Sequence, residues 1–241
     1  VGVTFVGEMR YPPSAKFLRK VLTDDRDART QVAALVAIGQ AGDREIVEEA
    51  TKMAIDTARK SSIYVLSLPR MYAGCRIPDA GKYLVGRLGA MKDEAALAAV
   101  IEAVGATGAP TAAPPLTELA AKSKWVSVQF EALRALGSCA GKDAMQTLLP
   151  YLAHEDWRLR MAAAEGLGRT GETKIIPQLA ELLVEGQEPI VVETAAEAIG
   201  VLGGETAVEP LIQALRVGRL RARNKARPLL VGIARDTFRQ R

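Results

Sequence analysis

The sequence predicts an all-α protein, folded as a right-handed α-solenoid of about seven helical hairpins with a period of 31–33 residues. One observation is the composition: 49% of the 241 residues are hydrophobic but only 5% are aromatic. Burial therefore rests on Ala, Leu and Val, and Ala and Leu are strong helix formers. The second observation is an internal repeat, because a helix of small residues that ends in glycine recurs at regular intervals.

The repeat is clearest at five glycines that close stretches such as FEALRALG and MAAAEGLG. The five are Gly39, Gly105, Gly137, Gly168 and Gly200. Successive steps are 66, 32, 31 and 32 residues; the first covers two periods, and a further step of 32 leads to Gly232. Each glycine is expected to cap its helix in the left-handed conformation. Gly166 is expected where one such helix crosses closely over its neighbour.

A second helical pattern precedes each glycine helix, with apolar residues three and four positions apart. Examples are AKFLRKVL, APPLTELA, IIPQLAELL and AVEPLIQAL. Pro115, Pro177 and Pro210 lie near the starts of these helices, where a missing N–H costs least. A hairpin of about 32 residues cannot bury its own apolar face, so neighbouring hairpins must stack.

The stretch LRMAAAEGLGRTGETKIIPQLAELL, residues 159–183, resembles the short HEAT-like repeat first named after phycobilin lyases. Arg160 stands at the arginine position of that repeat, and the resemblance extends over roughly residues 15–238. The chain departs from the pattern where Pro69 interrupts the second repeat. It also departs at the arginine position of four other copies, which hold Gln31, Leu97, Gln129 and Val192. The resemblance implies the fold of a HEAT-repeat domain and leaves the function open, because such arrays serve many roles.

We expect a single domain over residues 1–241: a lead-in at 1–14, repeats at 15–215 and a basic capping repeat at 216–241. No apolar run approaches the roughly 18–20 residues that span a bilayer, and the first residues do not resemble a signal peptide. Cys75 and Cys139 fall two repeats apart, about 20 Å at helix-packing distances, which is too far for a disulfide. Two free thiols favour a cytoplasmic protein; an extracytoplasmic location after precursor cleavage and the oligomeric state stay open.

Helix periodicity divides the residues of each glycine helix between two faces. One face is apolar throughout, as at Ala132 and Ala163, and is expected to form the core. Resemblance to HEAT arrays implies that the other, exposed face lines a concave groove, whose charges nearly cancel at a net −1. The expected partner-binding residues mix aromatic, sulfur-containing and charged side chains, as protein interfaces do. They are Phe130, Glu131, Arg134, Arg158, Met161, Glu165, Glu193 and Glu197. The alternative is a face laced with ion pairs that binds nothing.

Positive charge gathers at the C-terminal end, although the whole chain carries only +4. Residues 216–241 hold nine arginines and lysines against Asp236 alone, a net +8, so residues 1–215 carry −4. The basic end comprises Arg216, Arg219, Arg221, Arg223, Lys225 and Arg227. These side chains could meet an acidic partner, anionic lipid or nucleic acid. Alternatively, they form the polar cap that the last repeat of a solenoid needs.

Few residues in this sequence are candidates for catalysis. His154 is the one histidine, whereas HEAT-like hydroxylases of the deoxyhypusine type assemble a di-iron site from several His-Glu pairs. One His and two scattered Cys cannot build a closed metal site or a nucleophile with its base, so His154 is expected to cap its loop. Trp125 and Trp157 resemble the aromatic residues of HEAT-like DNA glycosylases, but their positions between helices favour covers for the hairpin tops. No phosphate-binding loop occurs, and we expect no enzyme activity, metal or nucleotide cofactor.

The sequence therefore predicts a non-catalytic scaffold or adaptor that binds a protein partner along the concave helices. One alternative is binding of nucleic acid or an anionic surface through the basic end; the near-neutral groove itself does not suit a phosphate backbone. A second alternative follows from the resemblance alone: a lyase-like or chaperone-like subunit that acts on a chromophore protein.

Overall fold

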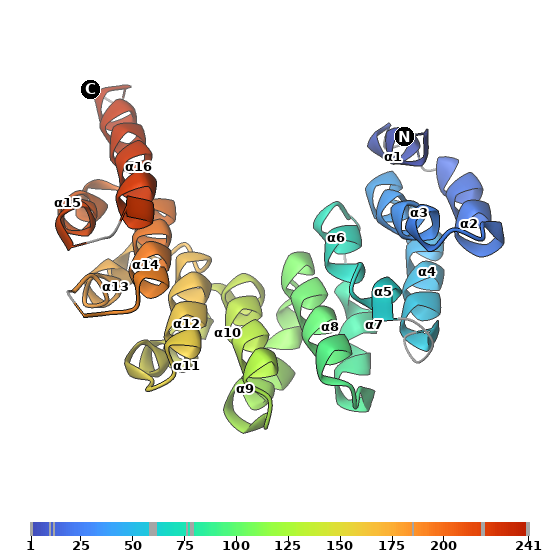
Figure 1. The fold of residues 1–241 in the computed structure, drawn as a ribbon, viewed down its shortest axis with the longest axis horizontal. Helices are drawn as coiled ribbons and strands as arrows, with labels where there is room; N and C mark the ends of the chain where they lie inside the picture. Colours follow the sequence, from blue (N-terminus) through green and yellow to red (C-terminus); the bar gives the residue numbers. More distant parts are fainter. Residues whose placement is uncertain are drawn as a thin grey trace.

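The computed structural model describes residues 2–9, 11, 13–57, 62–75, 77, 80–184, 186–217 and 220–239. These residues form helices and connecting turns and no strand, and 82% of the structure is helical. Figure 1 shows the helices following one another along an arc, with the two termini at its opposite ends. The predicted all-α solenoid is confirmed.

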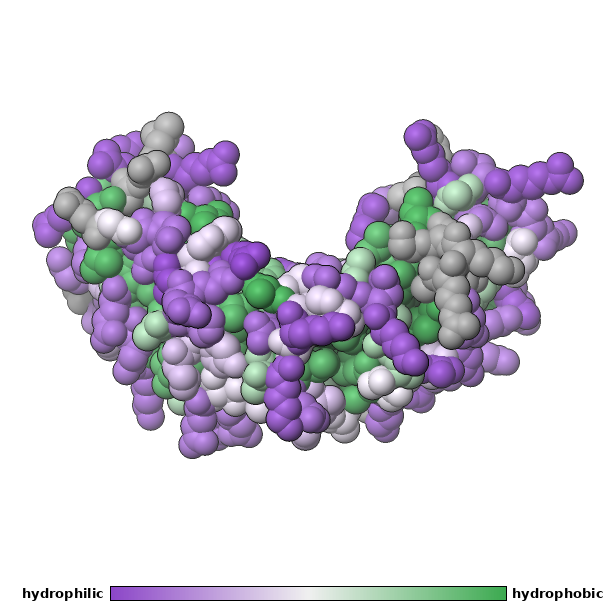
Figure 2. Space-filling view, turned by 60° about the horizontal axis from the view of Figure 1, so that its bottom comes forward, coloured by the Kyte–Doolittle hydropathy of each residue, from purple (hydrophilic) through white to green (hydrophobic). Residues whose placement is uncertain are grey.

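One row of helices, the inner row, packs helix against helix from each repeat to the next. Its members are α1 (Gly2–Glu8), α3 (Ala28–Ala41), the short pair α5 (Ser62–Val65) and α6 (Leu68–Ala73), α8 (Glu94–Thr107), α10 (Val126–Ala140), α12 (Trp157–Gly168), α14 (Pro189–Leu202) and α16 (Leu220–Arg239). Figure 2 shows the molecule as a crescent with a hollow between its two ends. In Figure 1 the inner row lies on the hollow side of the arc. Its helices contact one another more closely than the outer helices do, as the concave side of a curved array requires.

The outer row supplies one helix to each of the seven hairpins that the described residues form. Its members are α2 (Ser14–Asp24), α4 (Arg44–Thr57), α7 (Gly81–Arg87), α9 (Ala113–Lys122), α11 (Met145–Leu148), α13 (Ile176–Ala180) and α15 (Val208–Val217). Short 3₁₀ turns flank several of them: η1 (Leu88–Ala90), η2 (Pro110–Ala112), η3 (Gly141–Ala144), η4 (Leu149–Ala153), η5 (Thr173–Ile175) and η6 (Glu205–Ala207). As expected, Pro115, Pro177 and Pro210 fall within the first three residues of their helices.

The repeat glycines lie inside the inner helices, where neighbouring helices cross closely. A Cβ on Gly137 would lie 1.9 Å from the carbonyl oxygen of Gly166, and one on Gly39 would lie 2.1 Å from that of Met71. Gly166 itself would place a Cβ 2.5 Å from the carbonyl oxygen of Leu133, which confirms the close crossing predicted there. Since only glycine lets backbones approach so closely, the period of the sequence reflects the packing of inner helix on inner helix.

The left-handed caps predicted at the repeat glycines are wrong in position. Gly42, with φ 77°, caps the end of α3, and Gly108, with φ 62°, caps the end of α8; each stands three residues after a repeat glycine. The N–H of Gly42 donates to the carbonyl oxygen of Ile38, as a cap of this kind does. The helix therefore continues almost one turn past the crossing point. The positive φ is needed only where the chain then leaves the helix.

The ends of the inner row extend the same pattern. Gly7 in α1 stands 32 residues before Gly39, and a Cβ there would lie 2.6 Å from the Cβ of Ala37 on α3. The lead-in predicted for residues 1–14 thus includes a helix that packs as a further inner helix. Gly232 in α16 has no atom within 4 Å of such a Cβ, because no described inner helix lies beyond α16.

Burial follows the predicted face of each inner helix. Ala132 and Ala163 are fully buried, as expected, within one continuous apolar cluster that runs through the array. Aspartates at the start of inner helices satisfy free backbone N–H groups: the side chain of Asp93 accepts from the N–H of Ala96 at 2.8 Å. The same position is held by Asp156 in front of α12.

The second repeat is interrupted, as Pro69 predicts. The inner helix splits into α5 and α6, and Pro69 lies in the first turn of the second piece, two residues after Ser67. This repeat is anchored by Tyr72, whose hydroxyl lies 2.8 Å from Oγ1 of the buried Thr51 on α4. Burial raises the pKa of Tyr72 to about 12, and the hydrogen bond to Thr51 opposes part of that rise.

Arg160 and Gln31, which share one repeat position, join their helices to neighbouring turns. Arg160 donates to the carbonyl oxygen of His154 at 2.8 Å and to Oε1 of Gln187, in the next repeat, at 2.8 Å. Gln31 donates to the carbonyl oxygen of Leu22 at 3.0 Å. The arginine of the repeat thus has a structural role, and the shorter glutamine performs part of it.

Candidate partner-binding groove

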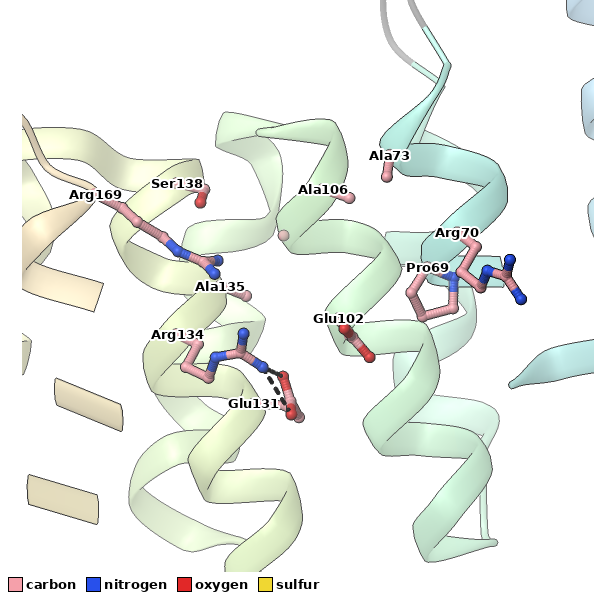
Figure 3. Close-up of a pocket in the computed structure, with 11 residues that line it drawn as sticks. Pro69, Arg70, Ala73, Glu102, Ala106, Glu131, Arg134, Ala135, Ser138 and Arg169 are labelled. Atoms are coloured by element: carbon pink, nitrogen blue, oxygen red, sulfur yellow. Dashed lines mark hydrogen bonds and ion pairs between the residues drawn. The ribbon is translucent and has the colours of Figure 1, made fainter. Parts of the chain in front are cut away.

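A groove of about 500 Å³, here the central groove, crosses the inner row from α6 to the end of α12. Small and charged side chains line it: Pro69, Arg70, Ala73, Glu102, Gly105, Ala106, Glu131, Arg134, Ala135, Ser138 and Arg169. Figure 3 shows Glu131 and Arg134 on α10 facing α8, which carries Glu102. The side chain of Arg70 extends from α6 on the side away from Glu102.

Ion pairs across two inner helices dominate the middle of the groove. Nε of Arg134 lies 2.7 Å from Oε2 of Glu165, and its Nη1 lies 2.9 Å from Oε2 of Glu131. Nη2 of Arg169 lies 2.6 Å from Oε1 of Glu165. The Arg134 side chain is only 20% exposed and that of Glu131 only 17%. Two arginines and two glutamates thus neutralise one another on the face that was expected to be open.

The pKa values of this network follow its burial and its charges. Burial raises the pKa of Glu131; Arg134 lowers it, while the negative charges of Glu102 and Glu165 raise it further. For Arg134, burial alone would lower the pKa, but the hydrogen bond to Glu165 and the negative charges of Glu131, Glu165 and Glu102 together raise it. Arg134 is therefore held in the charged form by its glutamates.

Phe130 and Met161, the expected apolar contacts, are less available than the sequence suggested. Both are half-buried and pack against the core. The guanidinium carbon of Arg134 lies 5.5 Å from the ring centroid of Phe130, so the arginine also covers the ring. The expectation of an exposed face is wrong for these residues, because the close crossing of neighbouring inner helices covers them. Their contact with a partner stays a prediction.

The other expected contact residues lie outside the lining of the central groove. Arg158 is 51% exposed in the first turn of α12 and pairs with Asp156 at 2.6 Å. The exposed carboxylate of Glu197 on α14 pairs with Lys225 on α16 at 3.0 Å. Glu193 is half-buried one turn earlier on α14. The structure therefore groups Glu131, Arg134 and Glu165 and leaves Arg158, Glu193 and Glu197 elsewhere on the row.

Sequence reasoning missed several lining residues, for two different reasons. Ala106, Ser138 and Arg169 each follow a repeat glycine directly. The position three residues before each repeat glycine was already assigned to the groove. Ala106, Ser138 and Arg169 lie four residues after that position, which is one helical turn further along the same face. The repeat therefore contained a signal for these positions. Arg70 lies in the interrupted second repeat, where the register could not be assigned from the sequence.

The described side chains of the basic end are exposed, but some of them already interact with other groups of the chain. Arg216, Arg221 and Arg227 are exposed. Arg223 is also exposed, and its Nη2 lies 3.5 Å from the carbonyl oxygen of Arg216. Lys225 is paired with Glu197. Arg219 lies outside the described residues. Binding of an acidic partner, nucleic acid or lipid at this end stays a prediction.

The residues considered for catalysis have structural surroundings. Nδ1 of His154 accepts from the N–H of Asp156 at 3.0 Å, and the ring stacks on Tyr151 with centroids 5.7 Å apart. This confirms His154 as a loop cap. Trp125 is half-buried against the core, with Nζ of Lys124 4.6 Å from its ring centroid, whereas Trp157 is exposed. In the described part of the chain, no three His, Cys, Asp or Glu side chains gather where a metal could bind.

Both cysteines are free thiols, as predicted. Burial raises the pKa of the Cys139 thiol to about 11 and also raises that of Cys75. Neither is therefore an activated nucleophile. Among the helices that the structure describes, none has both the length and the apolar character of a membrane span.

The solved structures that resemble this chain do so at low sequence identity. Human deoxyhypusine hydroxylase in complex with glycerol is 19% identical, with 97% of this chain and 78% of that one covered, at a TM-score of 0.46. An engineered protein is also 19% identical, with 92% and 96% covered, at a TM-score of 0.44. The karyopherin Kap121p, bound to the extreme C-terminus of the protein phosphatase Cdc14p, is 15% identical over 92% of this chain at a TM-score of 0.50. This chain covers only 26% of that karyopherin, and identities this low show the fold alone.

Sequence comparison identifies the repeat itself. No curated protein matches the sequence. The family model of HEAT repeats matches residues 126–200 and 145–231, which include the hairpins from α10 to α16. The 31–33-residue period and the paired rows of helices agree with that match. Residues 126–231 of this chain are therefore HEAT repeats, and the hairpins before them continue the same architecture.

Proposed function

We propose that this HEAT-repeat protein is a non-catalytic scaffold or adaptor that holds a protein partner along its inner row. The observation that carries the proposal is the central groove, which opens across successive inner helices on the hollow side of the crescent. Alanines and a proline form its walls between charged side chains. Protein interfaces combine apolar surface with charges in this way.

The charge distribution favours a protein over a polyanion in this groove. Arg134 and Arg169 are already neutralised by Glu131 and Glu165. A phosphate backbone would need a clear excess of free positive charge, since its affinity comes from displacing counterions. A protein segment needs no such excess.

The test is to obstruct the groove without removing a stabilising contact. Ala106 on α8 and Ala121 on α9 are both exposed, but only Ala106 lines the groove. Ala106→Arg should weaken binding of a protein partner, isolated from the native host, by at least about tenfold, whereas Ala121→Arg should leave the affinity unchanged. Circular dichroism verifies that both variants fold. Equal affinities for the two variants would refute the proposal.

Binding of nucleic acid or an anionic surface through the basic end is the second candidate. The observation that favours it is the exposure of Arg221 and Arg227 on α16. Replacing both by Ser should then abolish binding and flatten its dependence on salt, while Ala106→Arg should have no effect. Under the scaffold proposal, the same arginine replacements change mainly the association rate. Affinities measured at two salt concentrations separate the two functions.

A further inference from the structure

The inner row carries two further pockets beside the central groove, and an arginine stands at each junction. A pocket of about 300 Å³ between α3 and the interrupted second repeat shares Arg70 with the central groove. A pocket of about 480 Å³ between α1, α2 and α3 shares Arg29 with that second pocket. The three pockets therefore adjoin one another along the inner row, from α1 to the end of α12. We call the two outer members the N-terminal pockets.

Among the described residues, Arg70 has no counter-ion, and Arg29 interacts with Asp27 through its charge but without a direct ion pair. Neither guanidinium makes an ion pair or hydrogen bond there, in contrast to Arg134 and Arg169 in the central groove. The acid nearest to Arg29 in the sequence, Asp27, is engaged by the start of α3, where it accepts from the N–H groups of Arg29 and Thr30. No Asp or Glu lines either N-terminal pocket among the residues described.

The walls of these pockets are largely apolar, with Gln40 and Thr30 as their uncharged polar members. Val32, Val36 and Ile63 line the pocket between the two arginines, and Ile63 is 39% exposed. Val3, Val6 and Phe17 line the pocket beyond Arg29, and Phe17 is 55% exposed. Large apolar side chains are thus exposed beside unpaired positive charge. Such a surface is complementary to a partner that is both apolar and negatively charged.

We infer that the N-terminal pockets bind an extended protein segment in which acidic residues alternate with aliphatic ones. Its carboxylates pair with Arg29 and Arg70, and its aliphatic side chains fill the pockets on either side of Arg29. Guanidinium groups suit this role because they bind carboxylates through two parallel hydrogen bonds. The inference rests on the proposed scaffold function and specifies which part of the inner row recognises the partner and by what chemistry.

The experiment uses the full chain and a library of random 12-residue peptides displayed on phage. Peptides enriched on the wild-type protein should be rich in both Asp or Glu and Leu, Ile or Val. A fluorescein-labelled copy of the most enriched peptide then serves as the probe for anisotropy titrations. Combined Arg29→Ser and Arg70→Ser should weaken its binding at least about tenfold, and Ile63→Ser should weaken it by several-fold.

The matched control removes the same charge elsewhere on the exposed surface. Arg26 and Lys142 are exposed and line neither pocket, so Arg26→Ser combined with Lys142→Ser should change the affinity by less than about twofold. Circular dichroism verifies the fold of each variant. An equal loss in both double variants would show a non-specific charge effect and overturn the inference.

Other outcomes overturn the inference in ways that separate it from the scaffold function. Enriched peptides that are basic, or whose binding is blocked by Ala106→Arg but not by the arginine replacements, would refute the N-terminal site and retain the scaffold. Peptide binding that no inner-row variant affects would refute both. Tighter binding of fluorescein-labelled oligo(dT) than of the peptide, lost in the Arg29 and Arg70 variant, would assign the pockets to nucleic acid.

Discussion

The middle of the inner row and its two ends present different surfaces. In the middle, α10 and α12 cross at Gly137 and Gly166, and Arg134 is bound on both sides by glutamates. Towards the N-terminal end, the inner helix of the second repeat is broken into α5 and α6, and Arg70 has no partner among the described residues. At the other end, Gly232 on α16 faces open space.

The difference shows where a repeat array has groups left for binding. Where the repeat is regular, small residues and ion pairs are used to hold neighbouring helices together. Where the repeat breaks, Arg70 makes no ion pair among the described residues and Ile63 remains exposed. We therefore expect substitutions in the middle to change stability most, and substitutions towards the ends to change binding most.

The largest difference is expected between one glycine in the middle and one at the end. Gly137→Ala should destabilise the protein by about 3 kcal/mol, because its Cβ would lie 1.9 Å from a backbone oxygen that cannot move freely. Gly232→Ala should stabilise it by about 0.5–1 kcal/mol, since alanine has the lower entropic cost in a helix. Urea unfolding followed by circular dichroism measures both; changes of the same sign would contradict the packing described here.

Arg134→Met should destabilise the middle by about 2 kcal/mol at neutral pH, because Glu131 and Glu165 lose a charged hydrogen-bond donor. The penalty should decrease in acid. Burial raises the pKa of Glu131 in the folded chain, so its ionisation opposes folding as the pH rises through that pKa, and protonation below it removes the cost. Thermal unfolding at several pH values tests this. A penalty independent of pH would show that Arg134 acts through packing alone.

A smaller effect is expected at the start of α8. Asp93→Ala removes the acceptor for the N–H of Ala96 and should cost about 1 kcal/mol. Asp143→Ala, at an exposed aspartate in η3, is the control and should stay within about 0.5 kcal/mol of the wild type. If the two variants unfold at the same urea concentration, the cap contributes nothing to the stability of the array.

The fold could be predicted from the sequence because the repeat period reflects how the inner helices pack against one another. A glycine every 31–33 residues and buried alanines such as Ala132 follow from inner helices that cross one another, whatever the protein binds. The glycine's role was misassigned, since a pattern of glycines near helix ends does not distinguish a close crossing from a cap. Gly42 and Gly108, the actual caps, stand in the same sequence three residues later.

The binding surface was predictable only in part. Glu131, Arg134 and Glu165 were placed on the correct face, but their mutual pairing depends on rotamers and on helix spacing that a sequence does not contain. Arg70 could not be predicted as a groove residue, because the positions of the irregular second repeat cannot be aligned with those of the other repeats.

Site-specific photo-crosslinking shows directly whether the inner row holds a protein partner. A benzophenone amino acid is placed at Ala106 or Ser138 on the inner row, and at Ala121 or Gln146 on the outer row, and the protein is irradiated in extract of its native host. We expect both inner positions to crosslink to the same protein and neither outer position to do so. Crosslinks that form from the outer row alone, or from the inner row to nucleic acid instead of protein, would contradict this expectation.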